Sequence, residues 1–503
     1  MAVLTEILRN AAPVEAHQPW PRAVVDVAAW KTAANRLADG ALTLAGLWGE
    51  ANAVHMALIE PATGDIGVIS LDCEECRYPS VSRYHPPALR LERAIRDLFG
   101  LHPDGLPDDR PWLDHGRWGV RAPLGGRVAE PVTNPPAYDF LPVEGESLHQ
   151  IPVGPVHAGI IEPGHFRFTA NGETVVRLEE RLGYVHKGIE SLMAGAGLEH
   201  AAQLAGRTSG DSTVAYAYAF ARASEAATGI GAPPRAVWLR ALMAELERLA
   251  NHLGDIGAIC NDASFALMHA HCGVLRERVL RAADGCFGHR LMRDRIVPGG
   301  VAVDLDAEGR AAIRALVAEV RLRFPPLVEL YDNTASLKDR TVATGILTPA
   351  LANQYGAGGY VGRASGRAVD ARRSPGYAPY DTLEFEVPVL AEGDVDARVW
   401  IRIREVEQSL GLVEQILTQL PEGPLRVDVP QRAGEGMAIV EGFRGDVLVW
   451  LRLGEDGGVA RCHLRDPSWF QWPLLEAVIE GNIVADFPLC NKSFNCSYSG
   501  HDL

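Results

Sequence analysis

The stretch "PPRAVWLRALMAELERLANHLGDIGAIC", residues 233–260, carries the strongest helix signal of the chain. It begins with a tandem proline, and proline is favoured at the first position of a helix. Apolar residues then recur at alternating steps of three and four, which places them on one helical face: Leu239, Leu242, Leu246, Leu249, Leu253, Ile256 and Cys260. We therefore expect a long helix with this face in the core.

A polar row follows on a neighbouring face of the same helix. Glu245, Arg248 and His252 are spaced by three and four residues, so their side chains are neighbours on the helix surface. Such a row is typical of solvent-exposed ion pairs. It would be functional only if it lay at the centre of the protein.

The sequence pattern changes near residue 120. Upstream, "AVHMALIE" (53–60) and "GDIGVISL" (64–71) are strand-like, and a helix is expected after Pro86 and Pro87. Downstream, a Pro- and Gly-rich segment precedes "FRFTANGETVVRLEERL" (166–182), which predicts a hairpin turning at Asn171 and Gly172. The rest is expected to be largely helical, with further helices over 311–324 and 397–420.

These patterns predict an α+β protein. We expect a small α/β domain over 1–122, a linker over 123–150 and a mainly helical domain over 151–503 that opens with a short β-hairpin.

Composition excludes several classes of protein. Hydrophobic residues make up 47% and charged residues 22% of the 503 residues, as in ordinary globular proteins. The formal charge of −16 argues against a nucleic-acid partner. The longest uncharged run, between Arg340 and Arg363, is broken by five glycines and a proline, and the N-terminus lacks the apolar core of a secretory signal. Eight scattered cysteines suit a reducing cytoplasm. Because the longest uncharged run is a poor transmembrane helix, any association with a membrane is expected to be peripheral.

Several motifs carry a family resemblance. The segments "IPVGPVHAGIIEPGHFRFTANGE" (151–173), "ERLGYVHKGIESLM" (180–193) and "VDARRSPGYAPYDTLEFEVP" (369–388) resemble the large subunit of membrane-bound group 4 nickel-iron hydrogenases. They also resemble its descendant, the quinone-site subunit of respiratory complex I. The segment "RYHPPALRLERAIRDLFGLHPDG" (83–105) is similar to a second complex I subunit, which the hydrogenase-4 type carries fused ahead of the large subunit.

The resemblance implies four cysteine thiolates as nickel ligands, in a Cys-Gly-x-Cys and an Asp-Pro-Cys-x-x-Cys motif. The places of these motifs read "RTSGDS" (207–212) and "NCSYSGHD" (495–502), with Ser209, Ser212, Ser497 and Gly500 where cysteines are expected. Neutral hydroxyls do not replace soft thiolates on nickel. We therefore expect no metal in this chain, and Cys496 to be a buried small hydrophobe. A nickel-iron hydrogenase with unconventional ligands is the alternative.

In complex I, the cavity that holds the metal centre in the hydrogenases receives a quinone instead. Here the place that aligns with the quinone-binding tyrosine is Gly210, whereas Tyr216, Tyr218 and Tyr498 are either substitutes or packing residues. The resemblance also implies a set of ionisable groups for proton relay or coupling, with structural ion pairs as the alternative. These groups are His157, Glu162, His186, Asp211, Asp262, Asp370 and Arg372.

Two weaker motifs carry no site in this interpretation. Cys73 and Cys76, with His85 nine residues further on, form a partial zinc pattern that is better explained as two reduced surface thiols. The Gly-rich segment "GYVGRASG" (359–366) lacks the strand and helix setting of a nucleotide loop.

The resemblance implies a subunit of a membrane-associated, complex I-like oxidoreductase at the cytoplasmic face of the inner membrane. Expected partners are a small subunit with a tetranuclear iron-sulfur cluster, a ferredoxin-like subunit and antiporter-like membrane subunits. The chain itself would hold no cofactor, although quinone is a possible ligand. One hypothesis is an enzyme subunit whose emptied cavity takes a quinone or sulfur compound, and the other is a non-catalytic coupling scaffold.

Overall fold

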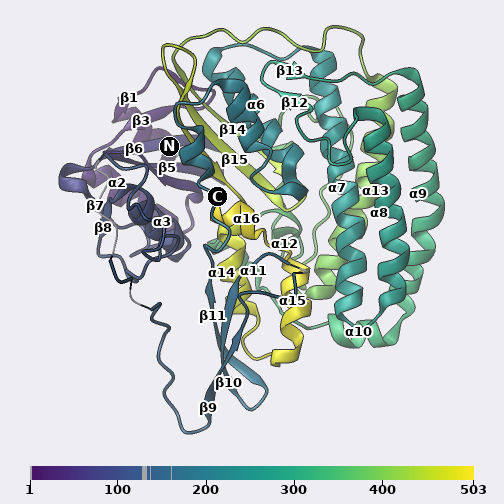
Figure 1. The fold of residues 1–503 in the computed structure, drawn as a ribbon, viewed down its shortest axis with the longest axis horizontal. Helices are drawn as coiled ribbons and strands as arrows, with labels where there is room; N and C mark the ends of the chain where they lie inside the picture. The colour runs from purple at the N-terminus through teal and green to yellow at the C-terminus, as the bar shows by residue number, and fades with distance from the viewer. Residues whose placement is uncertain (1–2, 127–132, 136, 160) are drawn as a thin grey trace.

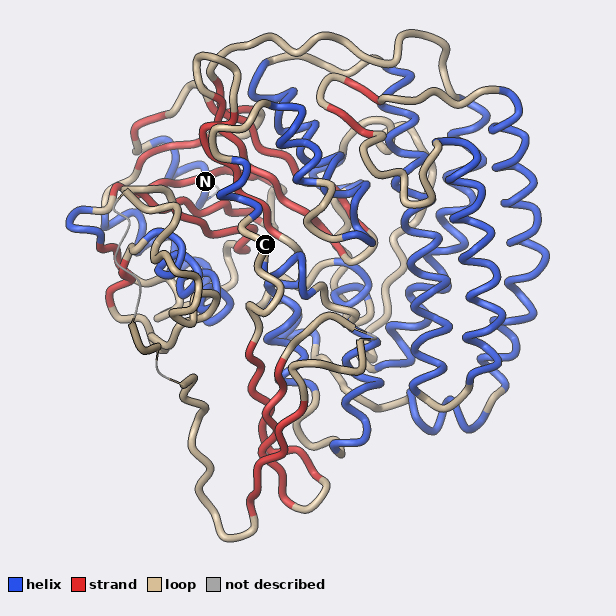
Figure 2. The backbone as a smooth tube through the Cα atoms, in the orientation of Figure 1, coloured by secondary structure: helices blue, strands red, loops and turns tan. Residues whose placement is uncertain are grey.

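The computed structural model describes residues 3–126, 133–135, 137–159 and 161–503. Its mixture of helices and sheets confirms the predicted α+β class. Figure 1 shows a group of long helices on one side, the N-terminal sheet on the other and a C-terminal sheet between them. Figure 2 shows the three-stranded sheet β9–β11 extending away from this body.

The N-terminal region is a five-stranded sheet with helices packed against it. The strand order is β1-β3-β6-β5-β4, and β5 and β6 confirm the two predicted strands. A short turn at 86–88 leads into α3, as the tandem proline predicts. The elements are α1 (Val3–Arg9), β1 (Ala12–Pro13), β2 (His17–Gln18), β3 (Arg22–Val24), α2 (Val27–Ala38), β4 (Thr43–Gly49), β5 (Ala53–Glu60), β6 (Asp65–Asp72), β7 (Arg77–Pro79), α3 (Leu89–Phe99) and β8 (His102–Asp104).

The expected linker is only partly irregular. Residues 127–132 and 136 lie outside the described residues, but β9 (Leu148–Val153) already begins within the predicted 123–150 segment. It pairs with β10 (His165–Asn171), which pairs with β11 (Thr174–Arg181), so the predicted two-stranded hairpin is a three-stranded sheet. Asn171 pairs with Thr174, and Gly172 takes the positive φ of 58° in the loop.

The helical group confirms the predicted long helix. This helix is α7 (Pro234–Asp262), and its leucine stripe is buried. Figure 1 shows α7, α8, α9 and α13 side by side. The helices that follow the N-terminal region are α4 (Ile189–Met193), α5 (Leu198–Ala205), α6 (Thr213–Thr228), α7, α8 (Ala266–Phe287), α9 (Ala307–Asn333), α10 (Ala335–Thr341), α11 (Pro349–Gln354), α12 (Gly359–Arg363), α13 (Val395–Gln419), α14 (Ser468–Val478), α15 (Phe487–Phe494) and α16 (Tyr498–Asp502).

Helix α9 is longer than expected. The sequence predicts it over 311–324, yet it runs from Ala307 through Pro325 and Pro326 to Asn333. Phe324, Leu327 and Tyr331 are all buried and continue the apolar face at helical spacing. Packing of that face therefore outweighs the local preference of proline to end a helix.

The expectation that the remainder is largely helical is wrong for residues 434–465. They form β14 (Gly434–Gly442), β15 (Gly445–Leu453) and β16 (Val459–Arg465), in a sheet of order β16-β15-β14-β2. These strands are buried on both faces, so they lack the alternating pattern that marks a half-exposed strand. A small ribbon, β12 (Ile296–Val297) and β13 (Gly300–Val301), lies between α8 and α9 in the chain.

Across the described residues, every helix is too short or too polar to cross a membrane.

Candidate functional site

Three chain segments meet where the resemblance places the hydrogenase metal. Ser209 and Ser212 lie just before α6, Ser497 is the N-cap of α16, and Arg444 lies in the two-residue turn between β14 and β15. The serine residues are only 3–4% exposed. The three predicted serine positions are therefore brought together, and we call the group of Ser209, Ser212, Ser497, Asp211 and Arg444 the serine cluster.

Hydrogen bonds within the serine cluster have a defined direction. The Ser209 hydroxyl donates to Asp211 Oδ1 at 2.8 Å and lies 3.1 Å from Ser497 Oγ. Because Ser209 has a single hydroxyl proton, Ser497 must donate to Ser209. Ser497 Oγ in turn accepts from the Gly500 amide at 2.9 Å, as an N-cap does. The hydroxyls thus satisfy one another.

Asp211 and Arg444 form the ion pair of the cluster. The two guanidinium nitrogens of Arg444 lie 2.8 and 2.6 Å from the Asp211 oxygens, and the Asp211 side chain is 36% exposed. Burial opposes ionisation of this carboxyl, but Arg444 outweighs it and lowers the pKa of Asp211 to about 2. The cluster therefore contains a permanent ion pair whose carboxylate reaches the surface.

Gly500 is in contact with a carboxylate. A Cβ atom at this position would overlap Asp466 Oδ2 and would lie 2.9 Å from Ser497 Oγ. The same Asp466 oxygen accepts the Tyr216 hydroxyl proton at 2.7 Å. The space that a side chain at 500 would need is thus filled by a hydrogen-bonded acid.

Glu247 of α7 lies behind the cluster. Its oxygens accept from the amides of Val214 and Ala215 at 2.7 and 3.1 Å, which caps the start of α6. Burial raises the pKa of Glu247 to about 8, against the effect of these two hydrogen bonds. Glu247 is therefore a buried acid that titrates near neutral pH.

The hairpin-loop candidates lie beside the C-terminal helix. Glu162 is exposed and accepts from the Ser499 amide at 3.0 Å, while His157 bonds to the Gly164 carbonyl at 2.8 Å. His186 bonds to the Asp502 carbonyl and stacks on Trp118 at 4.2 Å, and burial lowers its pKa. Glu162 and His186 thus contact the C-terminal segment, and none of the three candidates bonds to the serine hydroxyls in the described part of the chain.

A second, deeper cluster surrounds Asp370 and Arg372. Arg372 lies 2.7 Å from Asp370 and 3.0 Å from Glu245, and both arginine and aspartate are 2% exposed. The polar row Glu245, Arg248 and His252 is almost wholly buried, so the prediction that it is solvated is wrong. It lies at the centre of the protein because α7 is covered on its polar face as well.

This core ionic cluster contains more acids than bases. Its members are Arg248, Arg363 and Arg372 with Glu245, Asp370, Glu405 and Glu441. Burial, and then the charge of Asp370, raises the pKa of Glu441 to about 7. The arginines keep the pKa values of the other acids low, so Glu441 is the member that holds a proton most readily.

Polar contacts lead from one cluster to the other. Arg444 donates to the Asn495 carbonyl, and Asn495 donates to both oxygens of Asp255 at 3.0 Å. Asp255 therefore connects the serine cluster to α7.

Helix α13 continues this connection. Asp255 pairs with Arg402 of α13 at 3.3 Å. One helical turn away on α7, His252 pairs with Glu405 at 2.7 Å, and Glu405 contacts Arg363 of the core ionic cluster. The Asp255–Arg402 and His252–Glu405 pairs, one helical turn apart, thus lie between the serine cluster and the core ionic cluster.

The other candidates lie apart from these clusters. Asp262 ends α7, and burial raises its pKa. Cys496 is 4% exposed, which confirms its predicted burial, and all eight cysteines are free. Tyr216, Tyr218 and Tyr498 are buried. Among the described residues, no three or more His, Cys, Asp or Glu side chains are placed to hold one metal ion.

Arg444, Asp466 and Glu247 belong to the site but were not predicted from the sequence. The signal for Arg444 was "GFRG" (442–445), because two glycines around two residues mark a tight hairpin turn. It was overlooked because the region was expected to be helical. No pattern in the sequence indicates that Asp466 occupies the space next to Gly500.

Comparisons with known proteins fit this arrangement. Residues 25–129 match the family of the respiratory-chain NADH dehydrogenase 30 kDa subunit, and residues 263–433 match that of the 49 kDa subunit. Formate hydrogenlyase subunit 5 of Escherichia coli is 32% identical over 86% of this chain and 78% of that protein. The chain belongs to the family of these respiratory-chain subunits and related hydrogenase subunits. It carries both kinds of subunit domain in one polypeptide.

Two further proteins are similar to this chain. The carbon monoxide-induced hydrogenase of Rhodospirillum rubrum is 33% identical over 69% of this chain and 98% of that protein. An archaeal respiratory complex, the membrane-bound sulfane sulfur reductase, contains a chain of the same fold, with a TM-score of 0.68 and 26% identity over 72% of this chain and all of that one. The resemblance seen in the sequence is therefore confirmed.

Proposed function

We propose that this chain is the large subunit of a membrane-associated, complex I-like oxidoreductase complex and works without a nickel-iron centre. In this proposal it couples electron transfer on a neighbouring iron-sulfur subunit to ion translocation. The observation that carries the proposal is the set of polar contacts that leads from the serine cluster to the core ionic cluster.

The donor set supports the absence of nickel. Four thiolates would have to be replaced by three buried hydroxyls and a glycine whose side-chain space is filled by Asp466. Neutral hydroxyls bind nickel poorly, and a hydrogen bond between two of them leaves no room for an ion between them. These residues do not fit a nickel-iron centre, so the hydrogenase alternative is disfavoured.

The ionic contacts support a coupling role. Glu247 and Glu441 titrate near neutral pH at the two ends of the connection, and permanent ion pairs lie between them. A change of charge at the serine cluster alters the field along these pairs, because buried charges are weakly screened. The predicted relay roles of His157, Glu162, His186 and Asp262 belong to the same proposal.

We propose the partners and the location by analogy with the family. We propose a small subunit with a tetranuclear iron-sulfur cluster, a ferredoxin-like subunit and antiporter-like membrane subunits, with this chain bound at the cytoplasmic face of the inner membrane. Since the structural neighbour belongs to a sulfane sulfur reductase, a sulfur compound is the first acceptor to test, and a quinone is the second.

The closed packing of the serines favours the second candidate, a non-catalytic scaffold. Ser209, Ser212 and Ser497 are buried in the chain alone, which leaves a substrate little access to them. The C-terminal residues 498–503 are buried in the chain alone as well.

Asp211→Asn separates the two candidates. The amide keeps the shape of Asp211 and removes its charge, so ion-coupled turnover of the complex in vesicles should fall at least about tenfold. Glu162→Gln and Asp262→Asn should lower it as well, while the exposed Glu329→Gln on α9 is the control and should not. Unchanged coupling in the three assembled test variants, Asp211→Asn, Glu162→Gln and Asp262→Asn, would favour the scaffold.

Metal content tests the proposed absence of a nickel-iron centre. The purified complex should contain no stoichiometric nickel, should show no cyanide or carbonyl bands in the infrared and should neither evolve nor consume dihydrogen. About one nickel per chain together with such bands would overturn the proposal.

A further inference from the structure

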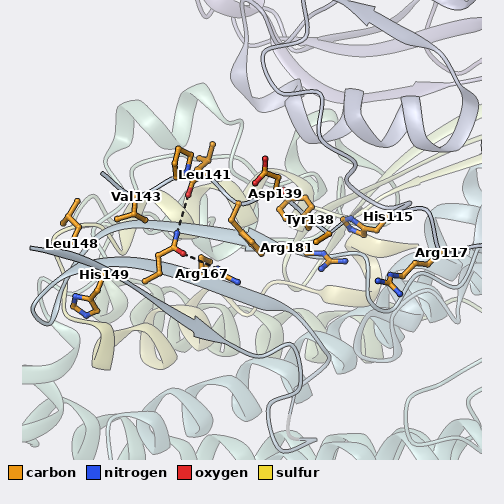
Figure 3. A pocket seen from close by; sticks show the side chains of 14 residues that line it. His115, Arg117, Tyr138, Asp139, Leu141, Val143, Leu148, His149, Arg167 and Arg181 are labelled. Carbon is orange, nitrogen blue, oxygen red and sulfur yellow. Dashed lines mark hydrogen bonds between the residues drawn. The ribbon is translucent and has the colours of Figure 1, made fainter. Parts of the chain in front are cut away.

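A cavity of about 880 Å³ lies between residues 137–143 and the sheet β9–β11. Figure 3 shows that it is long and has two different ends. Leu141, Val143 and Leu148 lie toward one end, together with His149 and Arg167. His115 and Arg117 lie at the other end, with Arg181 pointing toward them. The volume is in the range of pockets that hold small organic ligands.

Three arginines line this cavity without acidic partners. Arg117, Arg167 and Arg181 make no ion pair with any described residue, although the chain has 64 acidic and 48 basic side chains. Asp139 is the acidic residue among the described lining, and its carboxylate forms no ion pair with the described part of the chain either. Nearby Arg110, in contrast, pairs with both Asp108 and Glu179.

Aromatic rings hold two of these guanidinium groups in place. Arg167 lies 4.1 Å from the ring centre of Phe140, and Arg181 lies 5.4 Å from that of Tyr138. Stacking orients a guanidinium without using its N–H donors. Arg167 still donates to Gln150 Oε1 at 3.3 Å and to His165 Nε2 at 3.4 Å. The Nε of Arg181 is buried and has no hydrogen-bond partner among the described residues, which is a cost that an anionic oxygen would remove.

We propose that this cavity binds an amphiphilic anion, with its carboxylate or phosphate beside Arg117 and Arg181 and its apolar body between Leu141, Val143 and Leu148. A small inorganic anion would leave the apolar side chains of the cavity without a contact. An uncharged apolar ligand would leave the arginine charges uncompensated. A lipid headgroup and a soluble organic phosphate or carboxylate share this chemistry. The site is separate from the serine cluster and does not depend on the proposed function.

Titration calorimetry of the full chain with octyl phosphate, below its micelle concentration, tests the proposal. Binding should be saturable, and the double variant Arg117→Gln/Arg181→Gln should weaken it at least tenfold. Arg117→Gln alone should weaken it several-fold without affecting the fold, because Arg117 is exposed and unpaired among the described residues. Arg323→Gln, on the exposed side of α9, is the matched control and should change nothing.

Two further arms define the ligand. Inorganic phosphate and octyl glucoside should each bind at least tenfold more weakly than octyl phosphate. If the chain also co-sediments with phosphatidylglycerol vesicles and the double variant does not, the source is a lipid headgroup; if only octyl phosphate binds, it is soluble. No saturable binding of octyl phosphate, or equal binding by the double variant, would overturn the proposal.

Discussion

The serine cluster and the core ionic cluster each contain an aspartate–arginine ion pair, in opposite settings. In the core ionic cluster, Arg372 and Asp370 are sealed among helices and strands, and every charge depends on a neighbour. In the serine cluster, neutral hydroxyls surround one ion pair, and the Asp211 side chain is about one third exposed. Motif context alone did not distinguish them, although one is a structural interior and the other lies at an edge of the chain.

The difference shows which cluster can be reached from outside the chain. Removing a partner in the sealed cluster leaves a buried charge uncompensated, so the cluster has to stay intact for the fold to persist. At the serine cluster, a partner subunit or ligand can reach Asp211 from outside. We therefore expect mutations in the first cluster to act mainly on stability and mutations in the second mainly on function.

Arg372→Met should have the largest effect. It removes the guanidinium between Asp370 and Glu245 and leaves both carboxylates buried, which should lower the free energy of unfolding by about 3–5 kcal/mol. Urea unfolding followed by circular dichroism measures this loss. Arg321→Met, in an exposed pair with Glu414, is the control and should cost less than about 1 kcal/mol. A small loss for Arg372→Met would mean that the core cluster is not sealed.

Gly500→Cys should come next. The new Cβ would meet the Asp466 carboxylate, so restoring a cysteine at this family position should lower the free energy of unfolding by about 1–3 kcal/mol. Asp466→Ala in the same chain should cost less than the sum of the two single changes, because the clash is then absent. Gly273→Ala, where a Cβ has open space, is the control. Additive losses would contradict the assigned contact.

Glu247 links stability to pH. Its pKa of about 8 lies above the unfolded value of about 4.3, so the folded chain keeps a proton that the unfolded chain releases. This contribution to stability is complete below about pH 4 and is lost as the pH rises to about 8, by on the order of 1 kcal/mol per pH unit. Glu247→Gln should flatten this slope in urea titrations between pH 5 and 9, values chosen to span the range roughly between the two pKa values.

Exposed Glu407→Gln is the matched control and should keep the slope of the parent chain. An equal slope in the parent chain and in Glu247→Gln would show that Glu247 is ionised in the fold.

The helices and strands that have periodic apolar residues could be predicted from the sequence. The spacing in α7 and the strands β5 and β6 followed from apolar patterns. The resemblance pointed to Ser209, Ser212 and Ser497, which the structure brings together. The β14–β16 sheet could not be predicted in this way, because strands buried on both faces look like helix cores in sequence. The burial of Glu245 and Arg248 could not be predicted either, because the segments that cover this face of α7 lie more than 100 residues away in the sequence.

The hydrogen bond between Ser209 and Ser497 is the smallest effect that still tests the comparison. Ser209→Ala removes the acceptor of the Ser497 proton and a donor to Asp211, and should cost about 1 kcal/mol in the free energy of unfolding. Ser497→Ala should cost a similar amount, since it also removes the cap on the Gly500 amide. The double variant should cost about 0.5–1 kcal/mol less than the sum, because the shared bond is lost only once. The exposed Ser336→Ala, on α10, should stay within about 0.5 kcal/mol of the parent. Strict additivity would mean that the two hydroxyls do not bond, and it would reopen the space between them to an ion.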